Sequence, residues 1–326
     1  MAAPHGKIPN RQPAAGDPRD PDLGALPRLF GPQTTLAAAV TVAGRGLHTG
    51  DRNQVRLLPA APGTGIVFRR PGRNGAPSEV CADWRYRVQQ RLCQALAAPD
   101  GTLFRTVEHL LASLSALGID NAIVDMDGEE LPIFDGSALP WCAALLDAGS
   151  IEQARPRRYI RVLRPVELVR DDNRSVRVEP ADGRFLTVRM DLTGFGEMSW
   201  SGEVNAASFV REVAPARSFG RLKWALPLKL YHLFSGEPVL RGASLRNVAP
   251  VWRDRILGGM RVPDEPACHR ALDVIGDLAL AGAPILGRVA AYRPGHDVNY
   301  AFVALLMQQT DAWEYVDAAP ADFGAG

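Results

Sequence analysis

The pattern of apolar and polar positions along the chain predicts helices in both halves. In residues 105–118, RTVEHLLASLSALG, valine and leucine recur at helical spacing, with Thr106 able to cap the start and Gly118 the end. The segment 267–281 carries the same period beside three polar residues set four apart. Helices are therefore expected over 105–118, from about Ser137 and Pro140, over 267–281, and after His296.

Strands are expected where β-branched and other apolar residues alternate with polar ones. Residues 34–60 read as two strands around a glycine-rich turn, and residues 119–136 read as strand, turn and strand. In the second half, the alternating segments are 159–170, 175–181, 185–193 and 285–295. Both halves thus mix strands with helices, which favours an α+β fold with functional residues at the ends of elements.

The polar stretch from about 150 to 158, IEQARPRR, is the expected boundary between two domains, because it carries proline and arginine in place of an apolar period. The expected organisation is a disordered tail over 1–33, an α+β domain over 34–150, a second over 158–310, and a C-terminal tail over 311–326. Within the second domain, residues 221–240 are rich in Leu, Trp, Tyr and Phe. They form either ordinary core or an apolar groove for a long ligand.

Composition narrows the class of protein. The chain has 326 residues, 46% of them hydrophobic, which suits folded domains with real cores. A formal net charge of +1 offers no general attraction to nucleic acid. Four cysteines at no metal-type spacing, no signal-peptide core and no uncharged span of about 20 apolar residues favour a cytoplasmic protein without stable membrane insertion.

Candidate metal chemistry centres on the helix 267–281. His269, Asp273 and Asp277 share one helical stripe, and the first two lie one turn apart, as two ligands of a zinc site would. His109 is a candidate third ligand, since zinc hydrolases use three protein ligands and leave one position open. Glu108 would then lie beside the metal without binding it, which suits a general base.

A simpler interpretation remains open on spacing alone. A histidine and an aspartate four apart on a helix also form solvated ion pairs worth roughly 0.2–0.5 kcal/mol. Small residues that follow His109 on its helical face, Ala112, Ser113 and Ala116, instead indicate close approach of another element. His48 sits alone in a loop, where a histidine is usually a surface residue.

Several motifs, in order, resemble one enzyme family, the UDP-3-O-acyl-N-acetylglucosamine deacetylases of lipid A biosynthesis. They cover about residues 34 to 310 and are specific in combination. The motifs are GLHTG, TVEHLLASL, GIDN, ELPIFDGSALPW, ARSFG, GASLRN, HRALDVIGDL and the GH at 295–296.

The resemblance implies two α+β domains of similar topology, with helices sandwiched between two β-sheets and the active site at the junction. It implies an enzyme that hydrolyses the N-acetyl group of a lipid-linked nucleotide-sugar to acetate and a free amine, the committed step of lipid A biosynthesis. It implies a zinc ion on His109, His269 and Asp273. Separately, a His, His, Asp set can also hold ferrous iron where zinc is scarce, and a monomer is the default expectation.

The resemblance also implies roles for the remaining site residues. Glu108 would be the general base, and His296 the protonated group that steadies the oxyanion and passes a proton to the leaving amine. Asp277 would orient and charge His296. The other implied contacts are Ser218 on the amide carbonyl, Phe219 on the nucleotide-sugar, Arg158 at the diphosphate, and an insert near 221–245 that forms a tunnel for the acyl chain.

Two departures from the family pattern lie near the expected substrate. Arg270 replaces the lysine that usually follows the zinc histidine, and Arg246 replaces an aspartate. The first exchanges a compact ammonium for a planar guanidinium, and the two are not interchangeable. These departures keep two alternatives open: a paralogue that deacetylates another N-acetyl sugar or amide, and a catalytically silent scaffold of the same fold.

Overall fold

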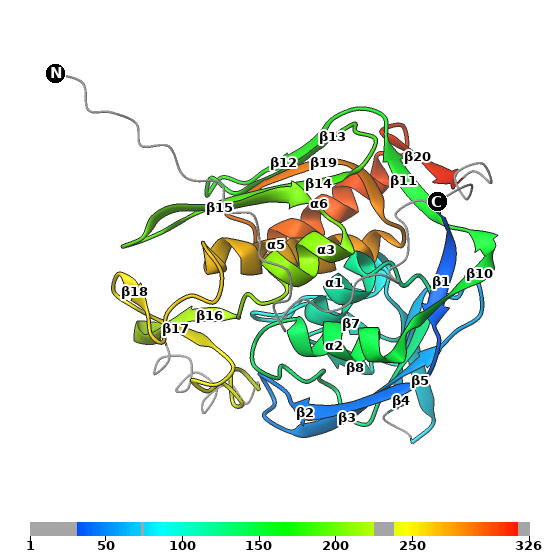
Figure 1. The fold of residues 1–326 in the computed structure, drawn as a ribbon, viewed down its shortest axis with the longest axis horizontal. Coiled ribbons are helices and arrows are strands. Elements are labelled where there is room, and N and C mark those ends of the chain that lie inside the picture. Colours follow the sequence, from blue (N-terminus) through cyan, green and yellow to red (C-terminus); the bar gives the residue numbers. More distant parts are fainter. Residues whose placement is uncertain (1–30, 73–74, 225–237, 319–326) are drawn as a thin grey trace, which may run out of the picture.

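The protein is described by a computed structural model that covers residues 31–72, 75–224 and 238–318. Its main helices lie in a layer between two β-sheets, one built from each half of the chain (Figure 1). This arrangement confirms the expected α+β class. The tail expected over 1–33 lies outside the described residues except for its last three, and so does the middle of the segment 221–245.

The sheet of the first half has five strands in the order β2-β3-β9-β4-β5. The central strand β9 is antiparallel to β3 and parallel to β4. A helix precedes β9 in the chain and another follows it. The elements are β2 (Val40–Arg45), β3 (Arg52–Pro59), β4 (Ile66–Pro71), β5 (Pro77–Cys81), α1 (Glu108–Ala116), β9 (Ala122–Met126) and α2 (Leu139–Ala148).

The second half repeats this topology. Its strands follow the order β12-β13-β19, and β14 lies on the other side of β19, parallel to it, with β15 beyond. Again one helix precedes the central strand and one follows it. The elements are β12 (Val166–Val169), β13 (Ser175–Glu179), β14 (Arg184–Leu192), β15 (Gly196–Glu203), α5 (Glu265–Leu278), β19 (Ile285–Tyr292) and α6 (His296–Gln308). Helices α1 and α5 are therefore topological equivalents.

Shorter elements complete the described chain. β1 pairs with β10, β20 and β11 extend the second sheet, and two further sheets have three short strands each. These strands are β1 (Pro32–Leu36), β6 (Arg87–Val88), β7 (Ala95–Ala97), β8 (Leu103–Arg105), β10 (Ser150–Pro156), β11 (Arg158–Val162), β16 (Phe219–Arg221), β17 (Ala249–Trp252), β18 (Arg255–Ile256) and β20 (Trp313–Asp317). The short helices are α3 (Ala206–Ser208), a π-helix Phe209–Val213, and 3-10 turns at Trp84–Tyr86, Leu222–Trp224 and Ala279–Ala281.

The local structure differs from expectation in three places. The polar segment 150–158 contains strand β10, which pairs with β1, while its place as a domain boundary stays a prediction. Part of the expected C-terminal tail is β20, which pairs with β11. The second strand expected within 119–136 is a loop, because the carboxylate of Glu130 draws this segment toward the backbone N–H groups of His48 and Thr49. In all three places the local structure is determined by contacts with residues distant in sequence, either a partner strand or a charged side chain.

The expected cap of helix α1 is also wrong at one end. Thr106 donates its hydroxyl to Glu130 instead of capping, and Val107 occupies the cap position without a side-chain bond. Gly118 does end the helix as expected, with a φ of 74° that favours glycine.

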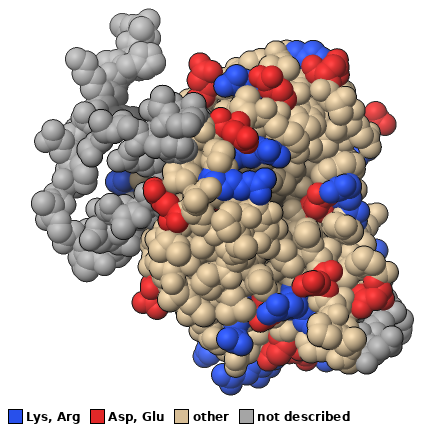
Figure 2. Space-filling view, turned by 90° about the vertical axis from the view of Figure 1, so that its right-hand side faces the viewer, with Lys and Arg blue, Asp and Glu red and all other residues tan. Residues whose placement is uncertain are grey.

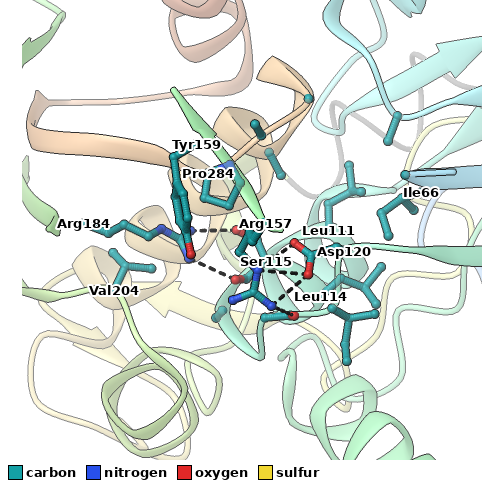
Figure 3. A pocket seen from close by; sticks show the side chains of 18 of the residues that line it. Ile66, Leu111, Leu114, Ser115, Asp120, Arg157, Tyr159, Arg184, Val204 and Pro284 are labelled. Atoms are coloured by element: carbon teal, nitrogen blue, oxygen red, sulfur yellow. Dashed lines mark hydrogen bonds and ion pairs between the residues drawn. The ribbon is translucent and has the colours of Figure 1, made fainter. Parts of the chain in front are cut away.

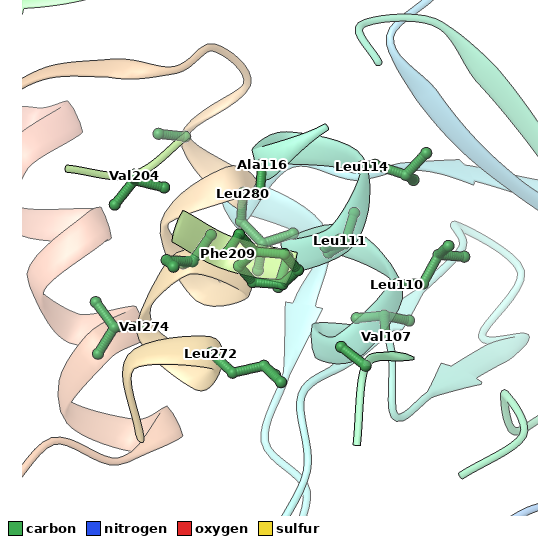
Figure 4. Packing of buried hydrophobic residues seen from close by; sticks show 14 of the residues in the cluster. Val107, Leu110, Leu111, Leu114, Ala116, Val204, Phe209, Leu272, Val274 and Leu280 are labelled. Atoms are coloured by element: carbon green, nitrogen blue, oxygen red, sulfur yellow. The ribbon is translucent and has the colours of Figure 1, made fainter. Parts of the chain in front are cut away.

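The core between the sheets is built from the apolar stripes of α1 and α5. Leu111 lies toward Phe209, whereas Leu110 and Leu114 project from the other side of α1 (Figure 4). These three leucines, Phe209 and Leu272 of α5 are all at most 1% exposed. Burying one such side chain stabilises a protein by roughly 1.5–3 kcal/mol. This shared core fixes the two helices against each other.

Helices α1 and α5 approach closely at Gly276. A Cβ atom on this glycine would lie 2.2 Å from the backbone oxygen of Glu108, so any side chain there would separate the helices. Close approach was expected at the small residues after His109. There the neighbour is α2, since Ser113 Oγ lies 3.7 Å from the sulfur of Cys142.

Acidic and basic residues are interspersed on the face shown in Figure 2, as the near-zero net charge predicts. Within the described residues, no helix is both long enough and apolar enough to span a bilayer.

Candidate metal centre and active site

Three buried side chains from two helices converge between the sheets. His109 comes from the first turn of α1, and His269 and Asp273 come from successive turns of α5. One ligand atom from each lies within 4.8 Å of the others, and none of the three residues is more than 5% exposed. The helical stripe noted in the sequence therefore faces inward, so a solvated ion pair is excluded.

The donor set fits a divalent cation. Burial lowers the pKa of His109 to about 3 and lowers that of His269, so both imidazoles are neutral and can offer a lone pair. Burial would raise the pKa of Asp273, but the neighbouring imidazoles and the guanidinium of Arg270 bring it to about 2, so it is ionised. Nδ1 of His109 has no hydrogen-bond partner among the described residues. Two neutral imidazoles and one buried carboxylate form a three-ligand set typical of zinc.

Neighbouring groups hold two of these side chains in place. The ring of His269 is fixed by a 3.1 Å contact between Nδ1 and the carbonyl oxygen of Ala216, which directs Nε2 toward Asp273. Arg270 donates to Oδ2 of Asp273 at 2.9 Å, leaving Oδ1 toward the histidine. Such partners set the orientation of metal ligands and tune their affinity.

Glu108 lies next to His109 and is itself buried. Its Oε2 accepts from the backbone N–H of Gln94 at 3.1 Å, and its Oε1 lies 3.7 Å from Nε2 of His296. Burial raises the pKa of this carboxyl to about 8. A carboxylate whose pKa is brought toward neutrality suits proton transfer at physiological pH.

His296 and Asp277 form a hydrogen-bonded pair on the other side of the cluster. Nδ1 of His296 lies 2.9 Å from Oδ2 of Asp277. The same oxygen accepts a hydrogen bond from the side chain of Asn299, and Oδ1 of Asp277 accepts one from the side chain of Gln94. Burial alone would lower the pKa of His296, but Asp277 and Asp273 raise it to about 10. The imidazole is therefore protonated at neutral pH and presents Nε2 toward Glu108.

These groups line one cavity of about 740 Å³. Ser218, Phe219 and Arg270 line the same cavity, as the resemblance implies. The ring of Phe219 lies 6.1 Å from that of His269, and the guanidinium of Arg270 lies 5.1 Å from the Phe219 ring centre. Arg270 thus bridges an aromatic wall and the candidate metal ligand Asp273.

Arg158 does not reach this cavity. It lies on β11 of the second sheet, where its guanidinium pairs with Asp317 of the edge strand β20 at 3.0 Å and lies over the ring of Tyr315. The charge that the resemblance assigned to the diphosphate is therefore elsewhere. Arg87, Arg174 and Arg293 line the cavity instead, and they come from three separate segments with no shared motif.

His48 is a further correction. The expectation of a surface histidine is wrong, because the residue is only 1% exposed and its backbone N–H donates to Glu130. Its ring lies close enough to Glu130 and His296 for their charges to affect its pKa, although burial is the main cause that lowers it. Asn299 and Gln94 were also missed, since neither residue type stands out in a sequence.

Comparison with known proteins gives a consistent family. Residues 33–308 match the family model described as LpxC: UDP-3-O-acyl N-acetylglycosamine deacetylase. A UDP-3-O-acyl-N-acetylglucosamine deacetylase from Phenylobacterium zucineum is 39% identical over 285 residues, 86% of this chain and 95% of the relative. Proteins of the same name from Neisseria meningitidis and Syntrophotalea carbinolica are each 35% identical over 89% of this chain, and the matches cover 94% and 92% of those relatives. The chain therefore belongs to the UDP-3-O-acyl-N-acetylglycosamine deacetylase family.

Proposed function

We propose that this protein hydrolyses the N-acetyl group of UDP-3-O-acyl-N-acetylglucosamine, releasing acetate and the free amine in the committed step of lipid A biosynthesis. One observation supports this proposal most directly. A single cavity contains three side chains that could bind one metal ion, together with a buried carboxylate and a protonated histidine. Family membership supplies the substrate class. A scaffold without activity would not require the last two groups.

The proposed cofactor is one zinc ion held by His109, His269 and Asp273. When bound, zinc would act as a Lewis acid on the amide carbonyl and lower the pKa of the attacking water. A His, His, Asp set also accepts ferrous iron, so metal analysis distinguishes the two ions.

The proton transfers are assigned to Glu108 and His296. Glu108 takes a proton from the attacking water as general base. His296 gives the proton on Nε2 to the departing glucosamine nitrogen, and Asp277 keeps the imidazole charged and aligned through Nδ1. The hydroxyl of Ser218 donates to the oxygen on which negative charge develops.

Recognition of the nucleotide-sugar is assigned to the cavity walls. Arg87 and Arg293 provide the positive charge for the diphosphate, since guanidinium groups bind phosphate oxygens in pairs. The charge of Arg174 is already balanced by Asp172 and Asp297. Phe219 offers a flat apolar face to the sugar or base. The acyl tunnel expected near 221–245 is retained as a proposal, although its central part lies outside the described residues.

The test is acetate release from UDP-3-O-acyl-N-acetylglucosamine by the full chain with its metal content measured. Glu108→Gln should lower kcat by about 10²- to 10⁴-fold, as expected for loss of a general base, while zinc stays bound. Glu167→Gln, at an exposed carboxylate paired with Arg177, should leave kcat unchanged.

Two results would contradict the proposal. Purified protein that binds no divalent metal would remove its chemical basis. Turnover of a different N-acetyl sugar, with none on the acylated nucleotide-sugar, would instead identify a paralogue with another substrate.

A further inference from the structure

A second cavity lies at the opposite end of α1 from the metal ligands. Its volume is about 320 Å³, and it shares no lining residue with the active-site cavity (Figure 3). The last turn of α1, the loop before β9 and the start of β14 surround it. Nothing in the proposed reaction uses this space.

Arg184 lines this cavity from a strand position whose neighbours on the same face are apolar. Side chains alternate along a strand, so Arg184 shares the inward face of β14 with Leu186, Val188 and Met190, which are all buried. Arg184 donates to the backbone oxygen of Ser115 at 3.0 Å and to its hydroxyl at 2.7 Å. These are both neutral acceptors.

Arg184 has no carboxylate within ion-pair distance in the part of the chain that the structure describes. Burial lowers its pKa to about 10, so it is still charged at neutral pH. A guanidinium has five N–H donors, and the two bonds to Ser115 leave others available. A half-buried cation with spare donors is available to an anion that enters the cavity.

The carboxylates around the cavity are already neutralised by other arginines. Asp120 is held by Arg157, whose Nε and Nη2 both donate to it at 2.8–2.9 Å (Figure 3). At the rim, Asp83 is paired with Arg85 through two further bonds. Each of these two ion pairs is neutral. The charge of Arg184 therefore gives the cavity a net charge of one positive unit.

The rest of the wall combines apolar side chains with a few neutral polar ones, among them Thr64 and Asn205. The apolar part of the lining lies opposite or beside the charged groups and consists of Ile66, Leu111, Leu114, Val204 and Pro284 (Figure 3). A site with one cation and hydrophobic walls matches a ligand with one negative charge and a small apolar body.

We propose that this cavity binds a small monocarboxylate with a short apolar chain, its carboxylate paired with the guanidinium of Arg184. Arginine and carboxylate match as planar, two-pronged partners, and a single carboxylate balances the single excess charge. A phosphate monoester carries about −1.5 to −2 at neutral pH and would leave negative charge against apolar walls, so it fits less well. This inference goes beyond the deacetylase function and does not depend on it.

The test is calorimetric titration of the full-length, metal-loaded protein with octanoate. Octanoate should bind, whereas the neutral octanamide and inorganic phosphate should each bind at least tenfold more weakly. Equal binding of octanamide would show that the apolar walls act without Arg184. Tighter binding of phosphate would make this a phosphate site. Either result overturns the proposal.

Variants locate the bound carboxylate. Arg184→Met should weaken octanoate binding at least tenfold. Arg184→Lys, which keeps the positive charge and guards against a folding defect, should weaken it less, since only the planar fork is lost. Arg189→Met, an exposed arginine on the opposite face of the same strand, is the matched control and should bind as the unchanged protein does.

A carboxylate could instead bind the metal centre, and His269→Ala separates the two sites. Octanoate binding that survives His269→Ala but is lost in Arg184→Met supports the proposal. The reverse pattern, with binding lost in His269→Ala and intact in Arg184→Met, would overturn it.

Discussion

Asp277 is the most constrained residue of the site, because it is fully buried and accepts hydrogen bonds from three side chains. His296, Asn299 and Gln94 all donate to its carboxylate at 2.9 Å or less. A carboxylate that only accepts is compatible with three donors, whereas an amide must direct its own N–H groups at one or more of them.

Asp277→Asn should therefore lower kcat about 100-fold while leaving KM within about twofold, since it removes the charge behind the proposed acid without touching the cavity wall. Steady-state kinetics on the acylated nucleotide-sugar would measure this. Asp311→Asn, an exposed aspartate paired with Arg164, is the control. A variant with unchanged kcat would mean that His296 does not depend on Asp277 for its charge.

Arg270 gives the second prediction at this scale. It is the only group shown to hold Oδ2 of Asp273 among the described residues, so Arg270→Ala should weaken zinc binding about 10- to 100-fold. Competition with a chelator would measure the affinity. Arg288→Ala removes an arginine that also covers an aromatic ring, Phe185 at 4.6 Å, but far from the metal ligands, and should leave zinc affinity unchanged. If both variants lost the same amount of zinc affinity, the loss would come from lower protein stability and not from the contact between Arg270 and Asp273.

Residues that repeat at helical spacing could be found from the sequence, and isolated ones could not. The four-residue interval between His269 and Asp273 predicted a shared face, which the structure shows. Arg174 and Arg293 carry no such signal, because only the folding of distant strands brings them to one cavity. Arg158 was placed there by resemblance alone, and its strand carries it away to Asp317.

At the scale of elements, the contact between α1 and α5 depends on one missing side chain. Gly276→Ala would place a Cβ 2.2 Å from the backbone oxygen of Glu108, and a backbone atom cannot move aside cheaply. The variant should lose about 1–3 kcal/mol of unfolding free energy, as overpacked cores do, and lower kcat by displacing Glu108. Denaturant unfolding would measure the first effect.

Gly220→Ala is the matched control for stability, since its added Cβ would meet nothing closer than 3.7 Å. A Gly276→Ala protein as stable and active as the unchanged one would show that the two helices can separate without consequence.

The start of α5 is fixed by a buried ion pair. Glu265 is 1% exposed and accepts from Nε and Nη2 of Arg217 and from the backbone N–H of Arg261. Although burial would raise its pKa, these donors lower it below the ordinary 4.5. Glu265→Gln should cost about 3 kcal/mol at pH 7, because the half-buried Arg217 is left without its counter-ion.

The pH dependence of this loss has a definite sign. A carboxyl whose pKa is lower in the folded state stabilises the protein above about pH 4.5 and loses that contribution as the pH falls through the folded-state pKa. The stability difference between the unchanged protein and Glu265→Gln should therefore narrow below pH 4.5. A difference that stays constant from pH 7 to pH 3 would mean that the charge of Glu265 contributes nothing.

The elements that could be predicted are those in which apolar residues recur at a regular helical or strand spacing. Helices α1 and α5 and strands β12, β13 and β14 were expected close to their observed positions. The errors fall where tertiary contacts override local pattern: polar β10 is a strand because β1 pairs with it, and Thr106 is not a cap because Glu130 takes its hydroxyl. Neither partner is near in sequence, so no local pattern reports it.

At the scale of the whole molecule, the two halves share one topology, and the proposed metal ligands come from equivalent helices. His109 lies on α1, before the central strand of the first sheet, and His269 and Asp273 lie on α5, before that of the second. The sequence shows no obvious repeat, so this equivalence appears only in the fold. A bound ion would cross-link the halves through residues that the unfolded chain does not hold together.

Metal removal should therefore lower the melting temperature of the whole protein. At a free zinc concentration one hundred times the Kd, binding to the folded state alone adds about 2.7 kcal/mol. For a chain of this length the expected shift is on the order of 5 °C, measured by calorimetry before and after chelation. His109→Gln should melt at the same temperature with and without added zinc, whereas Asp311→Asn should keep the full shift. If chelation removes the ion without changing the melting temperature, the metal does not join the two helices, and the shared core of α1 and α5 alone holds the halves together.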